Sequence, residues 1–294
     1  MNTLHQQMQQ NADKTTAALN EHVPSSDCPV VSAMRYTLQS GGKRVRPFIT
    51  MQFAAMTGMD EAVALPLACA IEMVHTYSLI HDDLPSMDDD DMRRGLPSCH
   101  IKFGEATAIL AGDALLTKAF EVAASADLPA ESIVRAVQIL AENSGIAGMI
   151  GGQQLDIAAE ARGGGYTLEE LEHINRGKTG GLMRTAALLG CVEVNDTPPV
   201  GGVARSAGVV LDLAADFAIN FGHAFQIVDD ILDYEEAIAA KVAPERKNYA
   251  TIFGVDSARE LARDKTAKAI ECLKDFAKNE FLIAMAEYNL NRVI

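Results

Sequence analysis

Two clusters of aspartate stand about half the chain apart, each at the end of an apolar stretch. Their members are Asp82, Asp83 and Asp88 with Asp89 to Asp91 in the first cluster, and Asp229, Asp230 and Asp233 in the second. Ionised carboxylates beside apolar segments are unfavourable unless a cation offsets their desolvation. Magnesium typically bridges a few carboxylates to substrate phosphates. The two clusters therefore predict a metal-dependent enzyme that acts on diphosphates.

The spacing within the second cluster is that of a helix. Asp229 and Asp233 are one helical turn apart, so both side chains project from one face. Asp230 is displaced sideways and could hold an outer-shell water.

The first cluster needs a break in its helix. Asp82 and Asp88 are six positions apart, which does not suit one continuous helical face. We therefore expect Pro85 to interrupt the helix and to let the chain return Asp88 toward Asp82. For Asp89 to Asp91 a solvated acidic loop is the alternative interpretation.

Basic residues lie where a diphosphate needs them. The segment Gly41-Gly42-Lys43-Arg44-Val45-Arg46-Pro47 places three positive charges at a helix start, where backbone N–H groups also favour an anion. Arg93-Arg94 follows the first acidic cluster, and guanidinium groups match phosphate oxygens in paired hydrogen bonds. Ordinary charge balance beside acids is the alternative for each pair alone. Together they predict two diphosphates, one bound by metal and one held by cations.

Composition favours an all-α chain. Hydrophobic residues make up 48% of the 294 residues, aromatic residues 5%, and tryptophan is absent. Alanine, leucine, isoleucine and methionine are plentiful, which favours helix over sheet. No alternating strand pattern of useful length occurs. We predict one all-α domain over residues 1–294, a bundle of roughly ten helices with the two metal-bearing helices near its centre.

Local signals mark several helix boundaries. Gly41-Gly42 closes one helix, and Pro47 suits the first position of the next. Asp60 can cap an apolar helix that Leu84-Pro85 ends.

Further signals divide the second half of the chain. Capping boxes are expected at Thr167 with Glu170 and at Ser257 with Glu260. Residues from about 200 to 238 predict one long helix or two nearly continuous ones. The segments 162–165 and 195–199 predict loops. A further set of glycines predicts close helix packing: Gly145, Gly148, Gly151 and Gly152.

The net charge and the cysteines indicate which binding partners and which cellular compartment to expect. The formal charge of -15 argues against nucleic acid as a partner. The five cysteines show no zinc-like spacing and indicate free thiols in a reducing cytoplasm: Cys28, Cys69, Cys99, Cys191 and Cys272. The polar N-terminus lacks a signal peptide, and no uncharged apolar stretch spans a membrane. We expect a soluble, cytoplasmic protein.

Five motifs in order resemble those of the trans-isoprenyl diphosphate synthase family, most nearly its bacterial farnesyl diphosphate synthases. The resemblance runs from about Met34 to Asp233 and more loosely to the end. The motifs are Gly42-Lys43-Arg44-x-Arg46-Pro47, Asp82-Asp83-x4-Asp88 with Arg93-Arg94, Gly152-Gln153-x2-Asp156, Lys178-Thr179, and Phe225-Gln226-x2-Asp229-Asp230-Ile231-Leu232-Asp233.

The resemblance implies an all-α homodimer with a central cavity, and a magnesium-dependent prenyl transfer. Isopentenyl diphosphate would condense with dimethylallyl or geranyl diphosphate to give farnesyl diphosphate and pyrophosphate. Three Mg²⁺ ions, with Mn²⁺ as an alternative, would be held by Asp82, Asp88 and Asp229, assisted by Asp83, Asp230 and Asp233.

The same resemblance assigns the two diphosphates. The allylic diphosphate would contact Arg93, Lys178 and Lys241. Isopentenyl diphosphate would contact Lys43, Arg46, His75 and Arg94. Thr179 and Gln226 are the candidates for oxygen dipoles near the allyl cation, and with Lys178 they form the catalytic set.

Tyr77 and Ser78 are the candidates for the floor that sets product length. Tyr77 lies five residues before Asp82, more than one turn along the helix, where its ring would stop the chain at C15. A plain core role for Tyr77 is the alternative. A geranylgeranyl or geranyl diphosphate synthase differs from the main interpretation through these two positions.

The chain departs from the family after Asp233. The segment from Tyr234 to Tyr249 is several residues shorter than usual, so Lys241, and Arg246 or Lys247, are the candidates for the family's loop cations. A terpene cyclase fits poorly because it needs no second diphosphate site. A non-catalytic regulatory subunit of a prenyl synthase is the alternative from another functional class.

Overall fold

The computed structural model describes residues 2–162, 166–194, 206–243 and 248–293. The all-α prediction is confirmed. The helices are α1 (Asn2–His22), α2 (Pro29–Gln39), α3 (Val45–Thr57), α4 (Glu61–Asp82), α5 (Cys99–Phe103), α6 (Glu105–Ala124), α7 (Ala130–Ser144), α8 (Met149–Ala161), α9 (Leu168–Lys178), α10 (Gly180–Leu189), α11 (Ala207–Ala239), α12 (Tyr249–Phe253), α13 (Val255–Leu273) and α14 (Glu280–Leu290). A short antiparallel hairpin joins β1 (Met92–Arg93) to β2 (Leu96–Pro97).

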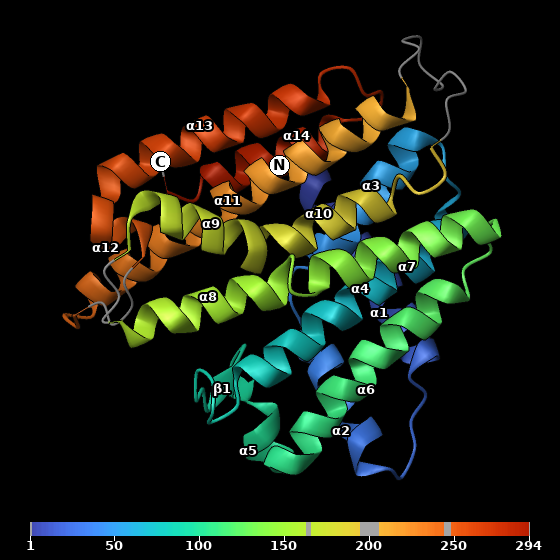
Figure 1. The fold of residues 1–294 in the computed structure, drawn as a ribbon, viewed down its shortest axis with the longest axis horizontal. Helices are drawn as coiled ribbons and strands as arrows, with labels where there is room; N and C mark the ends of the chain where they lie inside the picture. Colours follow the sequence, from blue (N-terminus) through green and yellow to red (C-terminus); the bar gives the residue numbers. More distant parts are fainter. Residues whose placement is uncertain (1, 163–165, 195–205, 244–247, 294) are drawn as a thin grey trace.

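The helices form one bundle with α4 and α10 in its interior. Figure 1 shows α13 and α14 along one edge of the bundle, and α2 and α5 at the opposite edge. The described chain contains more helices than the roughly ten expected, because short segments such as α5 and α12 are helices in their own right.

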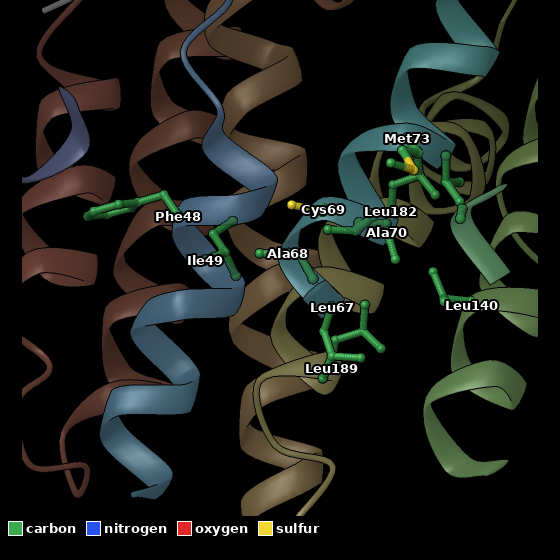
Figure 2. Close-up of a cluster of buried hydrophobic side chains, with 14 of the residues drawn as sticks. Phe48, Ile49, Leu67, Ala68, Cys69, Ala70, Met73, Leu140, Leu182 and Leu189 are labelled. Atoms are coloured by element: carbon green, nitrogen blue, oxygen red, sulfur yellow. The ribbon is translucent and has the colours of Figure 1, made fainter. Parts of the chain in front are cut away.

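The core is built around α4. Figure 2 shows Leu67 and Met73 of α4 between Ile49 of α3 and Leu140 of α7, and all four side chains are fully buried. Burying one such side chain contributes about 1.5–3 kcal/mol. Helix α4 is thus packed on nearly every side as far as Ile80, and its last residue, Asp82, is partly buried.

Two helices, α4 and α11, are long and apolar enough to cross a membrane by length and composition alone. Within this fold 67% of the apolar window of α4 and 44% of that of α11 are buried against other helices. Core helices of soluble proteins have the same composition, and the packing of α4 accounts for its apolar character.

Several predicted helix ends are confirmed and two are wrong. The Asp60 carboxylate accepts a hydrogen bond of 2.8 Å from the Ala62 N–H, and Thr167 forms a capping box with Glu170. Pro47 is the third residue of α3 and not the first, because α3 begins at Val45. Proline is tolerated there, since N–H groups of the first turn have no intrahelical partner.

The capping box at Ser257 and Glu260 is wrong. Helix α13 begins at Val255 with Gly254 as its N-cap, so Ser257 lies inside the first turn. Gly254 has φ +83°, a conformation open to glycine, which lets the chain pass directly from α12 into α13.

The long segment after residue 200 is one helix, α11, over its described part. The predicted loops at 163–165 and 195–199 lie outside the described residues.

The predicted role of the glycines in close packing is confirmed at α8. A Cβ atom on Gly152 would stand 2.2 Å from the Lys178 backbone nitrogen. Helices α8 and α9 therefore approach closely at this point, which brings Gln153 of α8 beside Lys178 of α9.

Candidate active site

Two cavities adjoin in the middle of the bundle. The first cavity, of about 670 Å³, is lined by residues that include Arg46, His75, Asp82, Gln153 and Thr179. The second cavity, of about 570 Å³, is lined by residues that include Asp156, Gln226, Asp230, Asp233 and Asn248. Lys178 lines both cavities, so it stands at their junction.

The first aspartate cluster turns back on itself as predicted. Helix α4 ends at Asp82, and the Asp88 N–H donates to the Asp82 carbonyl oxygen at 2.9 Å. Asp89 has φ +53°, and its N–H donates to the Leu84 carbonyl at 3.1 Å. These bonds close a tight loop that returns Asp88 to the end of α4.

Within this cluster the carboxylates have different partners. Asp82 accepts a hydrogen bond of 2.6 Å from Gln153 Nε2 and lines the first cavity. Asp83 is buried and accepts from Arg93 Nε at 2.8 Å, and Arg93 also pairs with Asp90 at 3.0 Å. Burial raises the pKa of the Asp83 carboxyl, and the hydrogen bond from Arg93 opposes that rise. The structure thus uses Asp83 and Asp90 to hold Arg93.

The three carboxylates of the loop, Asp89 to Asp91, also differ in their surroundings. Asp90 is engaged by Arg93, while Asp89 and Asp91 are exposed. The solvated-loop interpretation therefore applies to Asp89 and Asp91.

The second cluster projects from α11. Asp229 is partly buried and lies 2.8 Å from Arg292 Nη1. Burial raises the pKa of the Asp229 carboxyl, and the positive charges of Arg292 and Lys43 oppose the rise. Asp233 is exposed and lines the second cavity.

Asp230 is buried more deeply than the predicted sideways displacement implies. Its carboxylate accepts from Gln226 Nε2 and from the Tyr249 N–H, both at 2.9 Å. Burial raises the pKa of Asp230 to about 6. Asp230 thus ties α11 to the start of α12 and also lines the second cavity.

The three predicted catalytic residues lie together where the cavities meet. Lys178 Nζ is 2.7 Å from Asp156 Oδ2. Thr179 Oγ1 donates to Gln226 Oε1 at 3.1 Å, and Gln226 in turn donates to Asp230. This chain of hydrogen bonds connects α10 with α11 across the junction.

Among the basic residues predicted to hold the second diphosphate, Arg46, His75 and Arg94 lie together, while Lys43 lies toward the second aspartate cluster. Arg46 and His75 line the first cavity. Arg94 donates to the Gly41 carbonyl oxygen, and a Cβ atom on Gly42 would meet the Arg94 guanidinium at 2.8 Å. Lys43 lies near enough to Asp229 and Arg292 for their charges to act on its pKa, which burial lowers.

Burial lowers the pKa values of Arg46 and His75. The pKa of Arg46 falls to about 10 because the side chain is desolvated, with Glu72 opposing and Arg94 adding to the fall. The pKa of His75 lies well below its ordinary value because of burial and the neighbouring arginines. His75 is therefore neutral at neutral pH.

The structure does not bring Lys241 to either cavity lining. It follows the end of α11 with φ +58° and is exposed, while its neighbours Ala240 and Val242 line the second cavity. Arg246 and Lys247 lie outside the described residues.

Both predicted floor residues line the first cavity. Tyr77 is 5% exposed, and its ring meets that of His81 edge-on with 5.8 Å between centroids. Its hydroxyl has no hydrogen-bond partner in the described chain, and burial raises its pKa to about 12. Ser78 donates to the His75 carbonyl oxygen at 2.8 Å. Their role in product length stays a prediction.

Sequence reasoning missed three groups in contact with these residues. Arg292 binds Asp229, the Tyr249 N–H binds Asp230, and Glu72 pairs with Arg44 beneath the basic residues. Neither Arg292 nor Tyr249 stands at a motif spacing. Tyr249 meets Asp230 through the packing of α12 against α11, and Arg292 meets Asp229 from 63 positions away.

The donor set fits magnesium bound together with a phosphate group. Among the described residues no three His, Cys, Asp or Glu side chains converge closely enough to enclose a metal ion by themselves. The cluster side chains offer carboxylate oxygens, the donors that magnesium prefers, and magnesium commonly completes its shell with substrate phosphates and water. The residues therefore suit an ion that arrives with a diphosphate.

Comparison with known proteins gives concordant results. The family model named Polyprenyl synthetase matches residues 29–277. Farnesyl diphosphate synthase of Escherichia coli (strain K12) is 42% identical and covers 98% of this chain and 98% of its own length. Geranylgeranyl pyrophosphate synthase 4 of Arabidopsis thaliana is 38% identical and covers 96% of this chain and 76% of its own length.

Solved structures agree in fold. The crystal structure of an FPP/GFPP synthase from Zymomonas mobilis has a TM-score of 0.87 at 32% identity and covers 98% of this chain and 99% of its own. Sequence, fold and site geometry lead to one conclusion: the chain belongs to the polyprenyl synthetase family.

Proposed function

We propose that this protein condenses isopentenyl diphosphate with dimethylallyl or geranyl diphosphate to give farnesyl diphosphate and pyrophosphate. The observation that carries the proposal is the junction at Lys178, where a cavity bearing Asp82 and a basic group adjoins a cavity bearing Asp230 and Asp233. The family acts on isoprenoid diphosphates with a divalent metal, and its farnesyl diphosphate synthases are among the relatives of this chain.

The aspartates are proposed to hold the metal. Asp82, Asp88 and Asp229 would bind three Mg²⁺ ions, with Asp83, Asp230 and Asp233 assisting. When bound, the metal neutralises charge that builds on the departing pyrophosphate as the allylic C–O bond breaks.

Two basic residues are proposed to hold the same leaving group. Lys178 would exchange Asp156 for a phosphate oxygen, a short movement because it already stands between the cavities. Arg93 is preset by Asp83 and Asp90, so its guanidinium needs little reorganisation. Lys241 is the proposed third cation.

Isopentenyl diphosphate is proposed to occupy the basic end of the first cavity. Arg46 offers a buried Nε with no acceptor in the described chain, and neutral His75 offers a ring N–H without adding charge. Lys43 and Arg94 would complete the contacts. Charge-assisted bonds of this kind are about twice as strong as neutral ones.

The allyl cation is proposed to form between these two groups. Thr179 Oγ1 and Gln226 Oε1 supply oxygen dipoles at the junction. Apolar side chains that line the first cavity and are not exposed would shield the cation from water: Leu116, Met149 and Leu182. The double bond of isopentenyl diphosphate would attack the allyl cation, forming a C–C bond. The released pyrophosphate would accept the proton that the isopentenyl unit then loses.

Product length is proposed to depend on Tyr77 and Ser78, which line the first cavity. Geranylgeranyl diphosphate synthases are also relatives of this chain, so a C20 product is the second candidate.

We also infer a homodimer in the cytoplasm. Large apolar side chains are exposed on and beside the walls of the first cavity: Ile109, Leu110, Ile146 and Ile150. A second copy covering them would remove apolar surface from water, as dimer interfaces do.

The test is a product assay. Purified protein is incubated with magnesium, isopentenyl diphosphate and allylic primers of increasing length, and the products are sized. A dominant C15 product is the expected result, and a dominant C20 product would replace it with the second candidate. Absence of condensation with every primer would leave the non-catalytic subunit.

A further inference from the structure

Three guanidinium groups crowd the start of α3, and one buried carboxylate faces them. Arg44 Nη1 lies 2.6 Å from Glu72 Oε1, and both side chains are 3% exposed. Arg46 and Arg94 are close enough for the charge of Glu72 to raise their pKa values. A buried ion pair is weak evidence for stability by itself, so this pair invites a functional explanation.

Glu72 holds Arg44 in an unusual backbone conformation. Arg44 is the N-cap of α3 and has φ +47°, in the left-handed region that residues with a Cβ atom seldom adopt. Its guanidinium group is hydrogen-bonded to two helices: it donates to the Glu72 carboxylate of α4 and to the carbonyl oxygen of Leu38 in α2. Such conformations persist where surrounding contacts over-determine them, and they cluster at functional sites.

Lys43 and Arg46, on either side of Arg44, are residues proposed above to bind isopentenyl diphosphate. Lys43 precedes Arg44, and Arg46, two positions on, presents an unpartnered buried Nε in the wall of the first cavity, as judged over the described residues. His75, which lines the same cavity, lies three positions after Glu72 on α4, about one helical turn away. The Glu72 carboxylate is thus connected both to the Lys43–Arg46 segment, through Arg44, and to His75, through α4.

We propose that Glu72 is a positioning residue: through Arg44 it fixes the Lys43–Arg46 segment so that the segment and His75 converge on one diphosphate. This inference rests on the proposed function, in which that diphosphate belongs to isopentenyl diphosphate.

Charge and geometry predict opposite results when Glu72 is neutralised. A carboxylate near an anion site weakens anion binding through Coulomb repulsion. By charge alone, Glu72→Gln would therefore tighten diphosphate binding. If Glu72 positions the segment, its loss frees Arg44, the segment shifts, and diphosphate binding weakens.

The experiment measures binding of isopentenyl diphosphate by calorimetry without metal, and KM for both substrates with magnesium. The variants are Glu72→Gln and Arg44→Lys. The lysine of the second variant keeps the positive charge but cannot make both hydrogen bonds of the Arg44 guanidinium, to Glu72 and to the Leu38 carbonyl oxygen. Each should weaken isopentenyl diphosphate binding by about tenfold or more, since small misplacements have large effects. KM for geranyl diphosphate should change less than about twofold, because that substrate uses other residues. Glu61→Gln is the matched control, because Glu61 forms an exposed pair with Lys14 at 2.5 Å.

A double variant separates positioning from stability. Arg44→Met with Glu72→Gln leaves no unpaired buried charge, so its Tm should recover toward that of the wild-type protein. Isopentenyl diphosphate affinity should stay low, because the grip on the segment is still absent. Should Glu72→Gln unfold at the assay temperature, the double variant decides alone.

The outcomes are distinct. Unchanged or tighter binding by Glu72→Gln, or recovery of both Tm and affinity in the double variant, would overturn the role of Glu72. Failure of the wild-type protein to bind isopentenyl diphosphate would overturn the proposed function, and the role of Glu72 with it.

Discussion

Arg292 Nη1 lies 2.8 Å from Asp229 Oδ1, joining the C-terminal end of the chain to the second aspartate cluster. The guanidinium is 21% exposed and the carboxylate 34%, so the pair sits partly sheltered beside Lys43. A metal ion that binds Asp229 must share or displace this contact. Arg292 is therefore a competitor for the oxygen that the proposed mechanism assigns to magnesium.

The first prediction concerns this competition. Arg292→Gln should tighten divalent metal binding roughly threefold to tenfold, the effect of removing an ion pair of about 1 kcal/mol. Calorimetric titration with Mn²⁺ in the presence of pyrophosphate measures the change. Arg162→Gln is the control, because Arg162 pairs with Glu170 in an exposed setting. Equal metal affinity in wild type and Arg292→Gln would show that the contact does not oppose the metal.

The second prediction concerns the metal requirement. Chelation should abolish condensation, and Mg²⁺ should restore it. Asp82→Asn and Asp229→Asn should each lower kcat by about 100-fold or more, because both carboxylates act on charge that develops in the transition state. Asp264→Asn, which removes an exposed partner of Lys268, should leave kcat unchanged. Activity that survives in either cluster variant would argue that one cluster suffices.

The third prediction is a stability change with pH at His223. This side chain is 5% exposed, and burial, with Lys265 adding, lowers its pKa to about 4 while Glu172 opposes. Between pH 6.5 and 4 the unfolded chain takes up a proton at His223 that the fold does not. The contribution of His223 to the free energy of unfolding is therefore fully present above pH 6.5, the ordinary pKa of histidine, and is lost as the pH falls from 6.5 to 4.

At pH 5 the loss from His223 is about 2 kcal/mol, which corresponds to a few degrees in Tm for a chain of this size. His223→Gln should reduce the difference in Tm between pH 7.5 and pH 5 by that amount. His173→Gln, at an exposed position of α9, is the control. An identical pH dependence in wild type and His223→Gln would assign the acid sensitivity to other groups.

The fourth prediction concerns product length. Tyr77→Ala should enlarge the first cavity and extend the products beyond C15, since the ring is buried and lines that cavity. Chromatographic sizing of the products measures the change. Tyr288→Ala removes a tyrosine of α14 and should leave product length unaltered. A C15 product from Tyr77→Ala would restrict this residue to a core role.

Much of the site could be predicted because its chemistry follows local spacing. Asp229 and Asp233 share a helical face, and Asp82 with Asp88 flank a proline break, so composition and period were enough to place them. The backbone bond between Asp88 and Asp82 confirms the return of the chain.

The remainder depends on tertiary packing. Asp229 and Arg292 are 63 positions apart, and only the docking of α14 against α11 brings them together. The capping box at Ser257 failed for a similar reason, since the N-cap of α13 is Gly254, three positions earlier than the local signal indicates. Lys241 was assigned by analogy with a longer loop; it is exposed in this structure, and its contact with the diphosphate stays a prediction.

The most direct test of the central claim is a crystal structure with Mn²⁺ and pyrophosphate, with the metal located by anomalous scattering. Pyrophosphate is expected at the junction beside Lys178, with ions bound by Asp82 on one side and Asp229 on the other. Ions confined to a single cluster, or pyrophosphate bound away from the junction, would contradict that claim.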